Sequence, residues 1–489
     1  MASNGTVVSV GNVSVTTTGT LANTLLQQIA SITAGSTLVT VPAAVSAGSA
    51  TAPITLPAAT AGANQVLTIP ATDTGVIQIP VGYTAVVYDG TGTLTGADSL
   101  TAIIGGNGLN YTGPAGTVIA NGTGSVTGVI NDSTPGAHIA VADAGENVMG
   151  SGEGQVYSFD SGSSTLNSAA TTQGAGSKQS VSVDGTATLI AYMNGSANFM
   201  QSGGNATFVA GPGGNTFTQT AGSGEYWASA AGDSITLGSA AGQETVAGAN
   251  SAGVQTIHGG AGADTIFAAG SAPGVGGVIY YGNSASTSSS FLVAGKGTST
   301  IYTAANETMY GNTGGSYVSL SSGSNMVFLG GGGADTITGN DSTGKATIWG
   351  LSNETITSSA SLGSAAYIVN GNNSAIDITN SSGGSNFLAL DGGVFAGNAT
   401  LTMSNAGHDG VALFSADLFG LSHVTHTLTI ANWQSTDILD LSPAGGASGY
   451  GATVAAAAQS ALASGNSFTL PDGTTVTFTG NKPTTIANV

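Results

Sequence analysis

The chain repeats an apolar residue every nine positions, and this repeat constrains its fold more than any other feature. The nine-residue steps are regular over Ile190, Phe199, Phe208, Phe217, Tyr226 and Ile235. Turn dipeptides such as Asn194-Gly195 and Gly203-Gly204 precede the apolar residues. A helix cannot keep one face over nine-residue steps that each contain a helix-breaking pair, whereas a strand followed by a turn can. The ladder therefore predicts a β-solenoid, and its equal steps disfavour the alternative of a plain β-sandwich core.

Two nine-residue units make one coil of a two-sided parallel roll, so every second unit stacks on the same side. With small insertions the first ladder continues through Val246, Ile257 and Ile266. A second run has spacings of eight to eleven and comprises Ile301, Met309, Val318, Val327, Ile337, Ile348 and Ile356. The predicted fold class is all-β, an elongated parallel β-solenoid (β-roll or β-helix) over residues 85–430.

The segments that flank this solenoid differ from it in sequence. Residues 1–84 are interpreted as an N-terminal assembly or capping segment, because prolines crowd between residues 42 and 80. Within this segment, alternating Val and polar residues predict a strand over 5–17, and apolar spacings of three and four predict a short helix over 21–32. Residues 431–489 form a C-terminal region in which the Ala-rich stretch 450–464 has high helix propensity.

Composition excludes several classes of function. The net charge is −20, arginine is absent, and the only basic residues apart from histidine are Lys178, Lys296, Lys345 and Lys482. So few cations cannot neutralise many phosphates, and we expect no nucleic-acid partner. Cysteine is also absent, which excludes disulfides and thiolate chemistry. No run of 18 apolar residues occurs, so we expect no membrane span, and the first residues do not resemble a cleaved export signal.

Two nonapeptides match the pattern G-G-x-G-x-D-x-U-x of calcium-binding β-rolls, at 259–267 and at 330–338. Carboxylates of stacked turns should lie about 18–20 positions apart. Glu244 precedes Asp264 by twenty residues, and Glu354 follows Asp335 by nineteen. We expect these two pairs to bind Ca²⁺, which prefers oxygen ligands. The same prediction assigns backbone carbonyl ligands to Gly260, Gly262, Gly331 and Gly333.

The alternative reading is that these aspartates only cap turns. Most repeats carry Asn, Ser or Gln at the corresponding place, and stacked side chains of this kind can hydrogen-bond to one another without any ion. The five histidines show no metal-ligand spacing, and no catalytic constellation occurs in the sequence. We therefore expect that the protein is not an enzyme.

The two nonapeptides resemble the glycine-rich repeats of RTX proteins, a family exported by type I secretion. The segment ANWQSTDILDLS at 431–442 resembles the stretch that follows the repeats in that family, with Trp433 at the aromatic position, and NSFTLPDGTTVTF at 466–478 resembles its terminal strands. The resemblance implies an uncleaved C-terminal secretion signal, recognition by the type I secretion machinery, and folding in extracellular calcium. It does not cover residues 1–84, and no toxin, protease or lipase module accompanies the repeats.

Because the repeats occupy most of the chain, we expect the solenoid itself to be the functional part. The leading hypothesis is a secreted, calcium-stabilised structural protein that assembles into fibres, a surface layer (S-layer) or a biofilm matrix at the bacterial cell surface. Open solenoid ends favour a head-to-tail filament or a lattice, and the strand at 5–17 would pair with a neighbouring copy. The alternatives are a monomeric calcium-binding adhesin that binds cell-surface polysaccharide and, less favoured, a β-helix polysaccharide lyase or epimerase.

Overall fold

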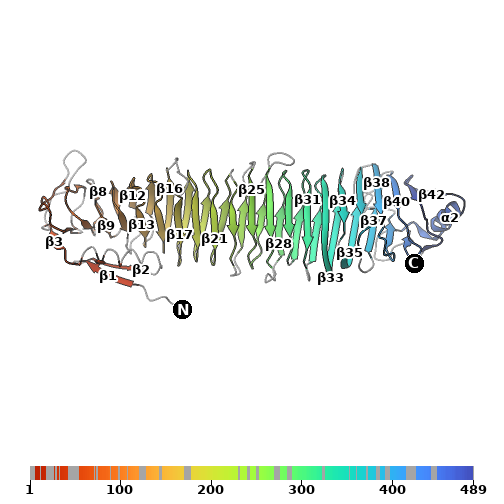
Figure 1. Ribbon diagram of the computed structural model, residues 1–489, viewed down its shortest axis with the longest axis horizontal. Helices are drawn as coiled ribbons and strands as arrows, with labels where there is room; N and C mark the ends of the chain where they lie inside the picture. Colours follow the sequence, from red (N-terminus) through yellow and green to blue (C-terminus); the bar gives the residue numbers. More distant parts are fainter. Residues whose placement is uncertain are drawn as a thin grey trace. The chain divides into compact units, whose positions relative to one another are not determined.

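The computed structural model describes residues 6–10, 13–17, 27, 30–31, 34–41, 54–70, 72, 75–88, 90–96, 100–106, 108–120, 128–142, 146–169, 178–229, 232–238, 243–248, 253–268, 276–283, 289–304, 306–321, 325–351, 353–359, 361–369, 373–381, 386–390, 397–414, 426–441 and 449–487. The chain divides into two compact units, which we call the N-terminal unit (Met1–Glu244) and the C-terminal unit (Thr245–Val489). Both consist of short strands that alternate between two parallel sheets (Figure 1). The predicted all-β parallel solenoid is confirmed.

The N-terminal unit places successive strands alternately in two sheets, and each strand pairs in parallel with the strand two further along the chain. Its sheet 1 contains β3 (Thr37–Thr40), β5 (Gln65–Ile69), β7 (Ala85–Tyr88), β9 (Ala102–Gly105), β11 (Thr117–Ala120), β13 (His138–Val141), β15 (Val156–Phe159), β17 (Gln179–Val183), β19 (Ala197–Gln201), β21 (Thr216–Gln219) and β23 (Ser234–Thr236). Its sheet 2 contains β4 (Ile54–Thr55), β6 (Val76–Gln78), β8 (Thr93–Thr95), β10 (Asn110–Thr112), β12 (Gly128–Asp132), β14 (Glu146–Gly150), β16 (Ser163–Ser168), β18 (Thr188–Met193), β20 (Asn205–Val209) and β22 (Ser223–Trp227).

The core of the N-terminal unit lies between these two sheets, where the predicted ladder supplies inward aromatic rings. Phe199 pairs in register with Phe217 in sheet 1, and Phe208 pairs with Tyr226 in sheet 2. The ring centroids of Phe199 and Phe208 are 4.4 Å apart across the core. All four rings are buried.

The assignment of Ile190 to this inward ladder is wrong, because its side chain is 39% exposed. Every residue of β18 from Leu189 to Met193 is apolar or aromatic, and the register places Ala191, not Ile190, beside Phe208. Since alternate side chains of a strand point to opposite faces, this register turns Ile190 outward.

The C-terminal unit has the same two-sheet arrangement. Its sheet 1 contains β25 (Val254–His258), β27 (Gly277–Tyr281), β29 (Ser299–Tyr302), β31 (Ser316–Leu320), the first part of β33 (Ala334–Gly350), β34 (Thr355–Ser358), β36 (Ser374–Asp377), β38 (Gly397–Thr402), β40 (His426–Ala431), β43 (Thr475–Thr479) and β42 (Ser467–Thr469). Its sheet 2 contains β24 (Glu244–Ala247), which begins at the unit boundary, β26 (Thr265–Phe267), β28 (Ser289–Val293), β30 (Asn306–Tyr310), β32 (Asn325–Leu329), the second part of β33, β35 (Ser361–Val369), β37 (Asn386–Leu390), β39 (Gly410–Leu413), β41 (Ile438–Asp440) and β44 (Ile486–Ala487).

The predicted inward residues of the C-terminal unit are buried with one exception. Val246, Ile257, Ile266, Ile301, Met309, Val318, Ile337, Ile348 and Ile356 are at most 1% exposed. Val327 is 38% exposed, and its neighbour Phe328 is the buried residue that pairs with Met309. As at Ile190, two adjacent apolar residues compete for one inward position, and the register decides between them.

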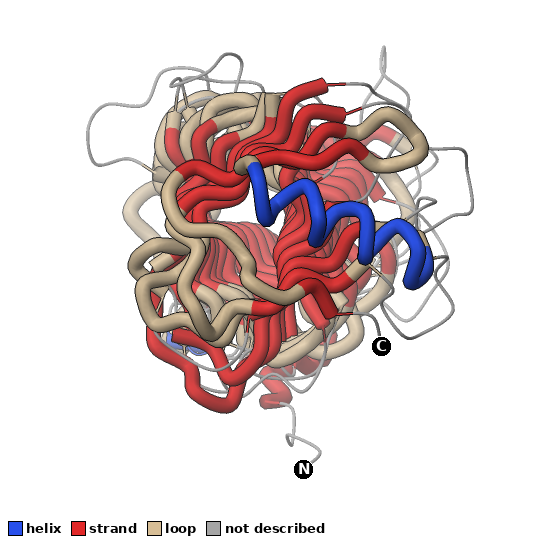
Figure 2. The backbone as a smooth tube through the Cα atoms, turned by 90° about the vertical axis from the view of Figure 1, so that its right-hand side faces the viewer, coloured by secondary structure: helices blue, strands red, loops and turns tan. Residues whose placement is uncertain are grey.

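The C-terminal unit ends in a cap. Its last parallel strand in sheet 1, β43, pairs on its other side with β42, which runs antiparallel. Helix α2 (Gly451–Ser464) contacts β42 and β44, and Figure 2 shows it lying across the end of the stacked strands. The helix prediction for the Ala-rich stretch is thus confirmed. Together α2 and β42 cover the strand edge at this end of the sheet.

At the N-terminus, the single strand predicted over 5–17 is wrong. Strands β1 (Thr6–Val10) and β2 (Val13–Thr17) pair antiparallel with each other as a separate two-stranded sheet. The dipeptide Gly11-Asn12 between them is a known hairpin-turn sequence. Most of the helix predicted over 21–32 lies outside the described residues, although Gln27, Ala30 and Ser31 are helical.

The parallel pairing extends beyond both predicted boundaries of the solenoid. Before residue 85, Thr37 of β3 pairs in register with Gln65 of β5. After residue 430, Thr427 of β40 pairs with Thr475 of β43, and Leu439 of β41 pairs with Ile486 of β44. Residues 85 and 430 therefore mark changes in composition and repeat pattern, not the ends of the parallel pairing. The proline-rich stretch still contributes strands because its Val, Leu and Ile residues fill the same interior.

Candidate functional site

Acidic side chains point into the solenoid at the place where a strand begins. Each of these acids stands two residues before a buried apolar residue, so strand alternation turns both side chains inward. The buried acids with this spacing are Glu146, Asp233, Glu244, Asp264, Glu307, Asp335, Glu354, Asp409 and Asp437. A buried carboxylate is costly unless it is hydrogen-bonded, paired or bound to a metal. These corner acids are therefore the chemically distinctive positions of the fold.

Asp264 of the first nonapeptide is 1% exposed and caps its own turn. Its Oδ2 accepts a hydrogen bond from the Gly260 amide at 2.8 Å. Its Oδ1 is buried and has no hydrogen-bond partner among the described residues. Burial raises the pKa of Asp264 to about 6, and the Gly260 amide opposes this rise. One oxygen of this carboxyl thus remains able to bind a cation.

The other member of the first predicted pair, Glu244, belongs to the N-terminal unit, whereas Asp264 belongs to the C-terminal unit. Glu244 is buried, and its Oε1 accepts a hydrogen bond from Gln219 Nε2 at 2.6 Å. The pairing of Thr245 with Thr265 in sheet 2 agrees with the predicted twenty-residue step between stacked turns.

The second predicted pair, Asp335 and Glu354, is brought together inside the C-terminal unit. Asp335 is 1% exposed and Glu354 is fully buried. Asp335 Oδ1 accepts the Ser316 amide, and Glu354 Oε2 accepts the Gly332 amide. The two carboxyls are in hydrogen-bond contact with each other. Asp335 Oδ2 and Glu354 Oε1 have no donor among the described residues, so a proton or a cation is needed between them.

The electrostatics of this pair favour an added positive charge. Burial, followed by the hydrogen bond and the negative charge of Asp335, raises the pKa of Glu354 to about 9. Burial also raises the pKa of Asp335, although its hydrogen bonds oppose the rise. Two like charges this close cannot both ionise without a counter-charge. The pair therefore holds a shared proton or a metal ion.

The four predicted carbonyl ligands lie in the turns that carry these acids. Gly260 and Gly262 are buried, and Gly260 uses its amide to cap Asp264. A Cβ added at Gly331 would lie 2.3 Å from the Asn312 nitrogen, and one at Gly333 would lie 2.6 Å from the Gly315 nitrogen. The glycines of the second nonapeptide thus permit the stacked turns to approach closely.

Calcium fits the donor set of this site in part. The Asp335–Glu354 pair offers two carboxyl oxygens without donors, which are hard ligands suited to Ca²⁺. Ca²⁺ takes about six to eight oxygen ligands. No group of three or more acidic or histidine side chains gathers anywhere in the described residues. The remaining ligands of a bound ion would therefore have to be backbone carbonyls of the glycine turns or water.

Three corner acids outside the two predicted calcium pairs are fully engaged as caps. Asp233 accepts the amides of Asn215 at 2.8 Å and Ser229 at 2.6 Å. Asp409 accepts the Ser404 amide at 3.0 Å. Asp437 accepts the Asp409 amide at 3.0 Å and the Gln434 amide at 2.8 Å. The spacing of an acid two residues before an inward apolar residue would have identified them from the sequence.

Polar ladders without charge stabilise other corners, as the sequence predicted for stacked Asn and Ser turns. Asn325 Nδ2 donates to Asn306 Oδ1 at 2.8 Å, and Asn373 Nδ2 donates to Asn353 Oδ1 at 3.2 Å. Asn353 and Asn373 have φ values of 61° and 57°, a left-handed conformation that Asn tolerates better than most residues. These Asn side chains thus hydrogen-bond to each other from one coil to the next.

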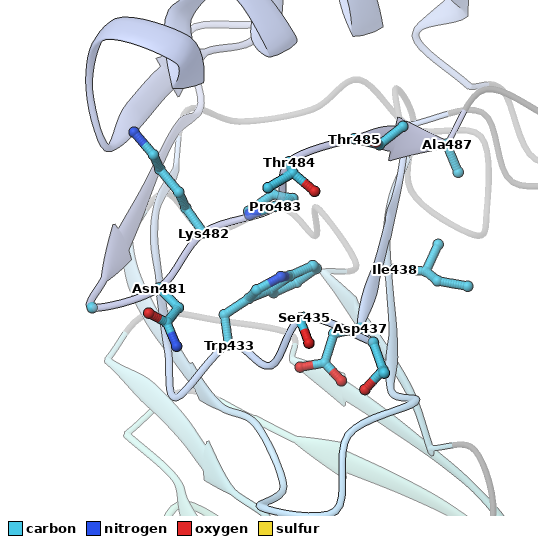
Figure 3. Close-up of a pocket in the computed structure, with 12 residues that line it drawn as sticks. Trp433, Ser435, Asp437, Ile438, Asn481, Lys482, Pro483, Thr484, Thr485 and Ala487 are labelled. Carbon is cyan, nitrogen blue, oxygen red and sulfur yellow. The ribbon is translucent and has the colours of Figure 1, made fainter.

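A cavity of about 760 Å³ lies near the C-terminal cap, between the segment 433–438 and the segment 480–487. Figure 3 shows Trp433 between the part that carries Asp437 and the part that carries Pro483 and Thr484. Trp433 is 2% exposed and packs edge-on against Phe478. Lys482 Nζ donates to the Gly465 carbonyl at 2.7 Å. The charged groups of this cavity are thus engaged in holding the cap together.

An exposed aromatic row crosses the outer face of sheet 1 in the C-terminal unit. His258, Tyr281 and Tyr302 stand in register on neighbouring strands. Their ring centroids are 4.7 Å and 4.9 Å apart, with interplanar angles of 8° and 4°. The rings therefore stack face to face along the solenoid and present their edges to solvent.

We predict that Asp335→Asn and Asp264→Asn each weaken calcium binding at least tenfold, because each change removes a carboxylate oxygen from a buried site. Isothermal titration calorimetry with CaCl₂ measures the effect. Glu225→Gln is the control, since Glu225 is exposed and its contact with Trp227 lies on the surface. If both aspartate variants gave the same calcium isotherm as the unchanged protein, neither acid would be a calcium ligand.

Comparison with known proteins adds no relative: no family model matches the chain, and neither the curated proteins nor the solved structures contain a match. Among the described residues, no helix is long and apolar enough to cross a membrane.

Proposed function

We propose that this chain is an extracellular structural protein that associates with further copies of itself into a fibre or surface layer, with calcium stabilising individual coils. The observation that supports this proposal most is the repetition of both the interior and the exterior of each unit. Inward side chains stack from coil to coil, and outward side chains form columns in the same register. Such a surface offers the same contact many times, which suits an ordered assembly.

The placement outside the cell rests on the resemblance of the nonapeptides and the tail to type I secreted proteins. Calcium has a defined place in the proposal. The Asp335–Glu354 pair is buried with unfilled oxygens, so a cation that binds only the folded state would stabilise the C-terminal unit by mass action. A low-calcium cytoplasm would then leave this unit less stable before export.

The structure bears on how the copies would join. At the C-terminal end, β42 and α2 cover the edge of the stack, which does not favour simple end-to-end stacking there. At the N-terminal end, β3 pairs only with β5 among the described strands, and its Leu38 is half exposed. The hairpin of β1 and β2 is a separate sheet that would have to open, or add as a pair, to extend a neighbour.

The second candidate function is a monomeric adhesin that binds polysaccharide, and the exposed row of His258, Tyr281 and Tyr302 favours it. Sugar rings commonly pack against the face of an aromatic ring. In this row the faces are covered by the neighbouring rings. We therefore interpret the row as rings that stack on one another along the outer face of the sheet. Self-association is the preferred proposal.

We predict that protein refolded from denaturant into calcium forms assemblies visible by negative-stain electron microscopy, and that a chelator slows or prevents this. A chain lacking residues 1–18 provides a second arm, because it removes β1 and β2 while leaving the parallel coils intact. A monodisperse monomer at high concentration in calcium would contradict the proposal. If that monomer is retained by immobilised polysaccharide, the adhesin reading replaces it.

A further inference from the structure

The outer face of sheet 2 in the C-terminal unit carries three straight columns of side chains over β26, β28, β30, β32 and the second part of β33. Register fixes the columns, since each residue pairs with the next along the stack. The polar column is Ser289, Asn306, Asn325 and Lys345; the central column is Thr265, Phe291, Thr308, Val327 and Thr347; the apolar column is Phe267, Val293, Tyr310, Leu329 and Trp349. We call this surface the sheet 2 face.

Large and small side chains alternate on this face from one strand to the next. In the apolar column the aromatic residues Phe267, Tyr310 and Trp349 stand on every second strand, and Val293 and Leu329 stand between them. The central column alternates in the opposite phase, because each aromatic residue has a Thr beside it on the same strand. Strands are about 4.8 Å apart, so ridges recur about every 9.6 Å.

The apolar residues of this face are partly exposed to solvent. Phe267 is 45% exposed, Tyr310 is 41% exposed and Val327 is 38% exposed. At its C-terminal limit Trp349 packs against a buried cluster that contains Ile368 and Phe414. Contiguous exposed apolar surface of this kind commonly marks a site of contact with another molecule.

The charge distribution selects the occupant. The chain has a net charge of −20 with 24 acidic residues. No acidic residue stands in any of the three columns, and Lys345 is their only charged member. Two copies that met through this face would therefore bring no acidic residues of the three columns against each other.

A hollow on the same face complements the aromatic ridge. It measures about 330 Å³ and is lined by the polar and central columns, with Asn306, Asn325 and Lys345 among its lining residues and the inward Glu307 beneath them. A two-fold axis parallel to the stacking direction turns one copy over onto the other. The apolar column of each copy then lies over the polar column and hollow of its partner, and the central columns face each other.

We propose that the sheet 2 face is a self-association surface, through which a second copy of this chain packs face to face about a two-fold axis parallel to the stacked coils. The contact is isologous, since the same three columns serve both copies. Tyr310 enters the partner's hollow beside Asn306, and Lys345 of each copy meets the Trp349 ring of the other. The inference rests on the proposed structural function and names the surface that would carry it.

The two-fold arrangement predicts that Val327 of one copy faces Val327 of the other. Val327→Glu should therefore weaken association at least tenfold, because like charges would be buried opposite each other. Val327→Lys should weaken it as well, and an equimolar mixture of the two variants should recover association. Sedimentation velocity of the full chain in calcium measures all three samples. The matched control is Thr300→Glu on the outer face of sheet 1, which should associate like the unchanged protein.

A probe placed on the axis gives an independent reading. The chain has no cysteine, so Thr308→Cys labelled with pyrene maleimide carries one label per chain. Facing sheets lie about 10 Å apart, within reach of two pyrene groups, and excimer emission should appear in calcium. Thr300→Cys labelled in the same way should show none.

The outcomes separate this inference from the broader proposal. If the unchanged protein assembles while Val327→Glu assembles equally well and Thr308→Cys gives no excimer, the sheet 2 face is excluded and the structural function stands. If the unchanged protein remains monomeric at every concentration tested, both proposals fail. If it remains monomeric and instead binds lipid vesicles through this face, the second-copy assignment is likewise overturned.

Discussion

Replacing Phe208 with Ala should destabilise the N-terminal unit by about 3–5 kcal/mol, the usual cost of deleting a fully buried aromatic side chain. Phe208 has no solvent exposure. Its ring lies 4.4 Å from that of Phe199 and 5.4 Å from that of Tyr226. The substitution therefore removes apolar burial, two aromatic contacts and the filling of the space between the sheets. Because a solenoid is stabilised by neighbouring coils, we expect the loss to be concentrated in adjacent strands.

Hydrogen exchange of the amides in β18, β20 and β22, together with the urea midpoint, would measure this loss. Thr207→Ala on the same strand is the matched control, because its side chain points outward, and it should change stability by no more than about 0.5 kcal/mol. If Phe208→Ala and Thr207→Ala had equal effects, the aromatic ladder would not be the core of this unit.

The nine-residue ladder was sufficient to predict this core because a strand–turn unit of fixed length must return each inward residue to the same place. It failed where two apolar residues are adjacent. At these two places the nine-residue spacing predicted that Ile190 and Val327 point inward. The register of the neighbouring strand instead turns Ala191 and Phe328 inward. Register depends on the lengths of the turns between coils. Because the steps vary from eight to eleven residues, the sequence does not determine which of two adjacent residues points inward.

The position of the candidate site was only partly accessible to sequence reasoning. The spacing between Asp335 and Glu354 indicated that the two acids would stack, and the structure brings their carboxyls together. Which atoms remain without donors depends on the amides of Ser316 and Gly332, and no motif specifies these contacts. The glycine pattern does not identify Asp233 and Asp409, because their turns lack it, although their spacing to the next inward residue is the same.

The covered C-terminal edge was likewise not predicted. Sequence composition identified a helix over the Ala-rich stretch, but composition does not state where a helix packs. Contacts of α2 with β42 and β44, and the antiparallel pairing of β42 with β43, close that end of the stack. Because this end is covered, we expect copies of the chain to associate through the outer faces rather than through the ends of the solenoid.

The buried pair should also make the C-terminal unit sensitive to pH when calcium is absent. The pKa of Glu354 is raised from 4.5 to about 9 in the folded protein. Between these two values the folded state binds more protons than the unfolded state, so the free energy of unfolding falls as the pH rises. The stabilisation is fully present below about pH 4.5 and is lost as the pH approaches 9. At about 1.4 kcal/mol per pKa unit, a rise from 4.5 to about 9 corresponds to a loss of roughly 6 kcal/mol.

Glu354→Gln should remove most of this dependence, because the amide is neutral at every pH and its Nε2 can donate to the unfilled Oδ2 of Asp335. Urea unfolding of the C-terminal unit in a chelator, followed by hydrogen exchange across the pH range, measures the difference. Glu225→Gln should retain the dependence of the unchanged protein, since Glu225 is exposed. Calcium should flatten the pH dependence of stability in the unchanged protein, because the cation takes the place of the shared proton. It should not change the pH dependence of Glu354→Gln. Identical profiles for Glu354→Gln and the unchanged protein in chelator would show that this pair is not what couples the unit to protons.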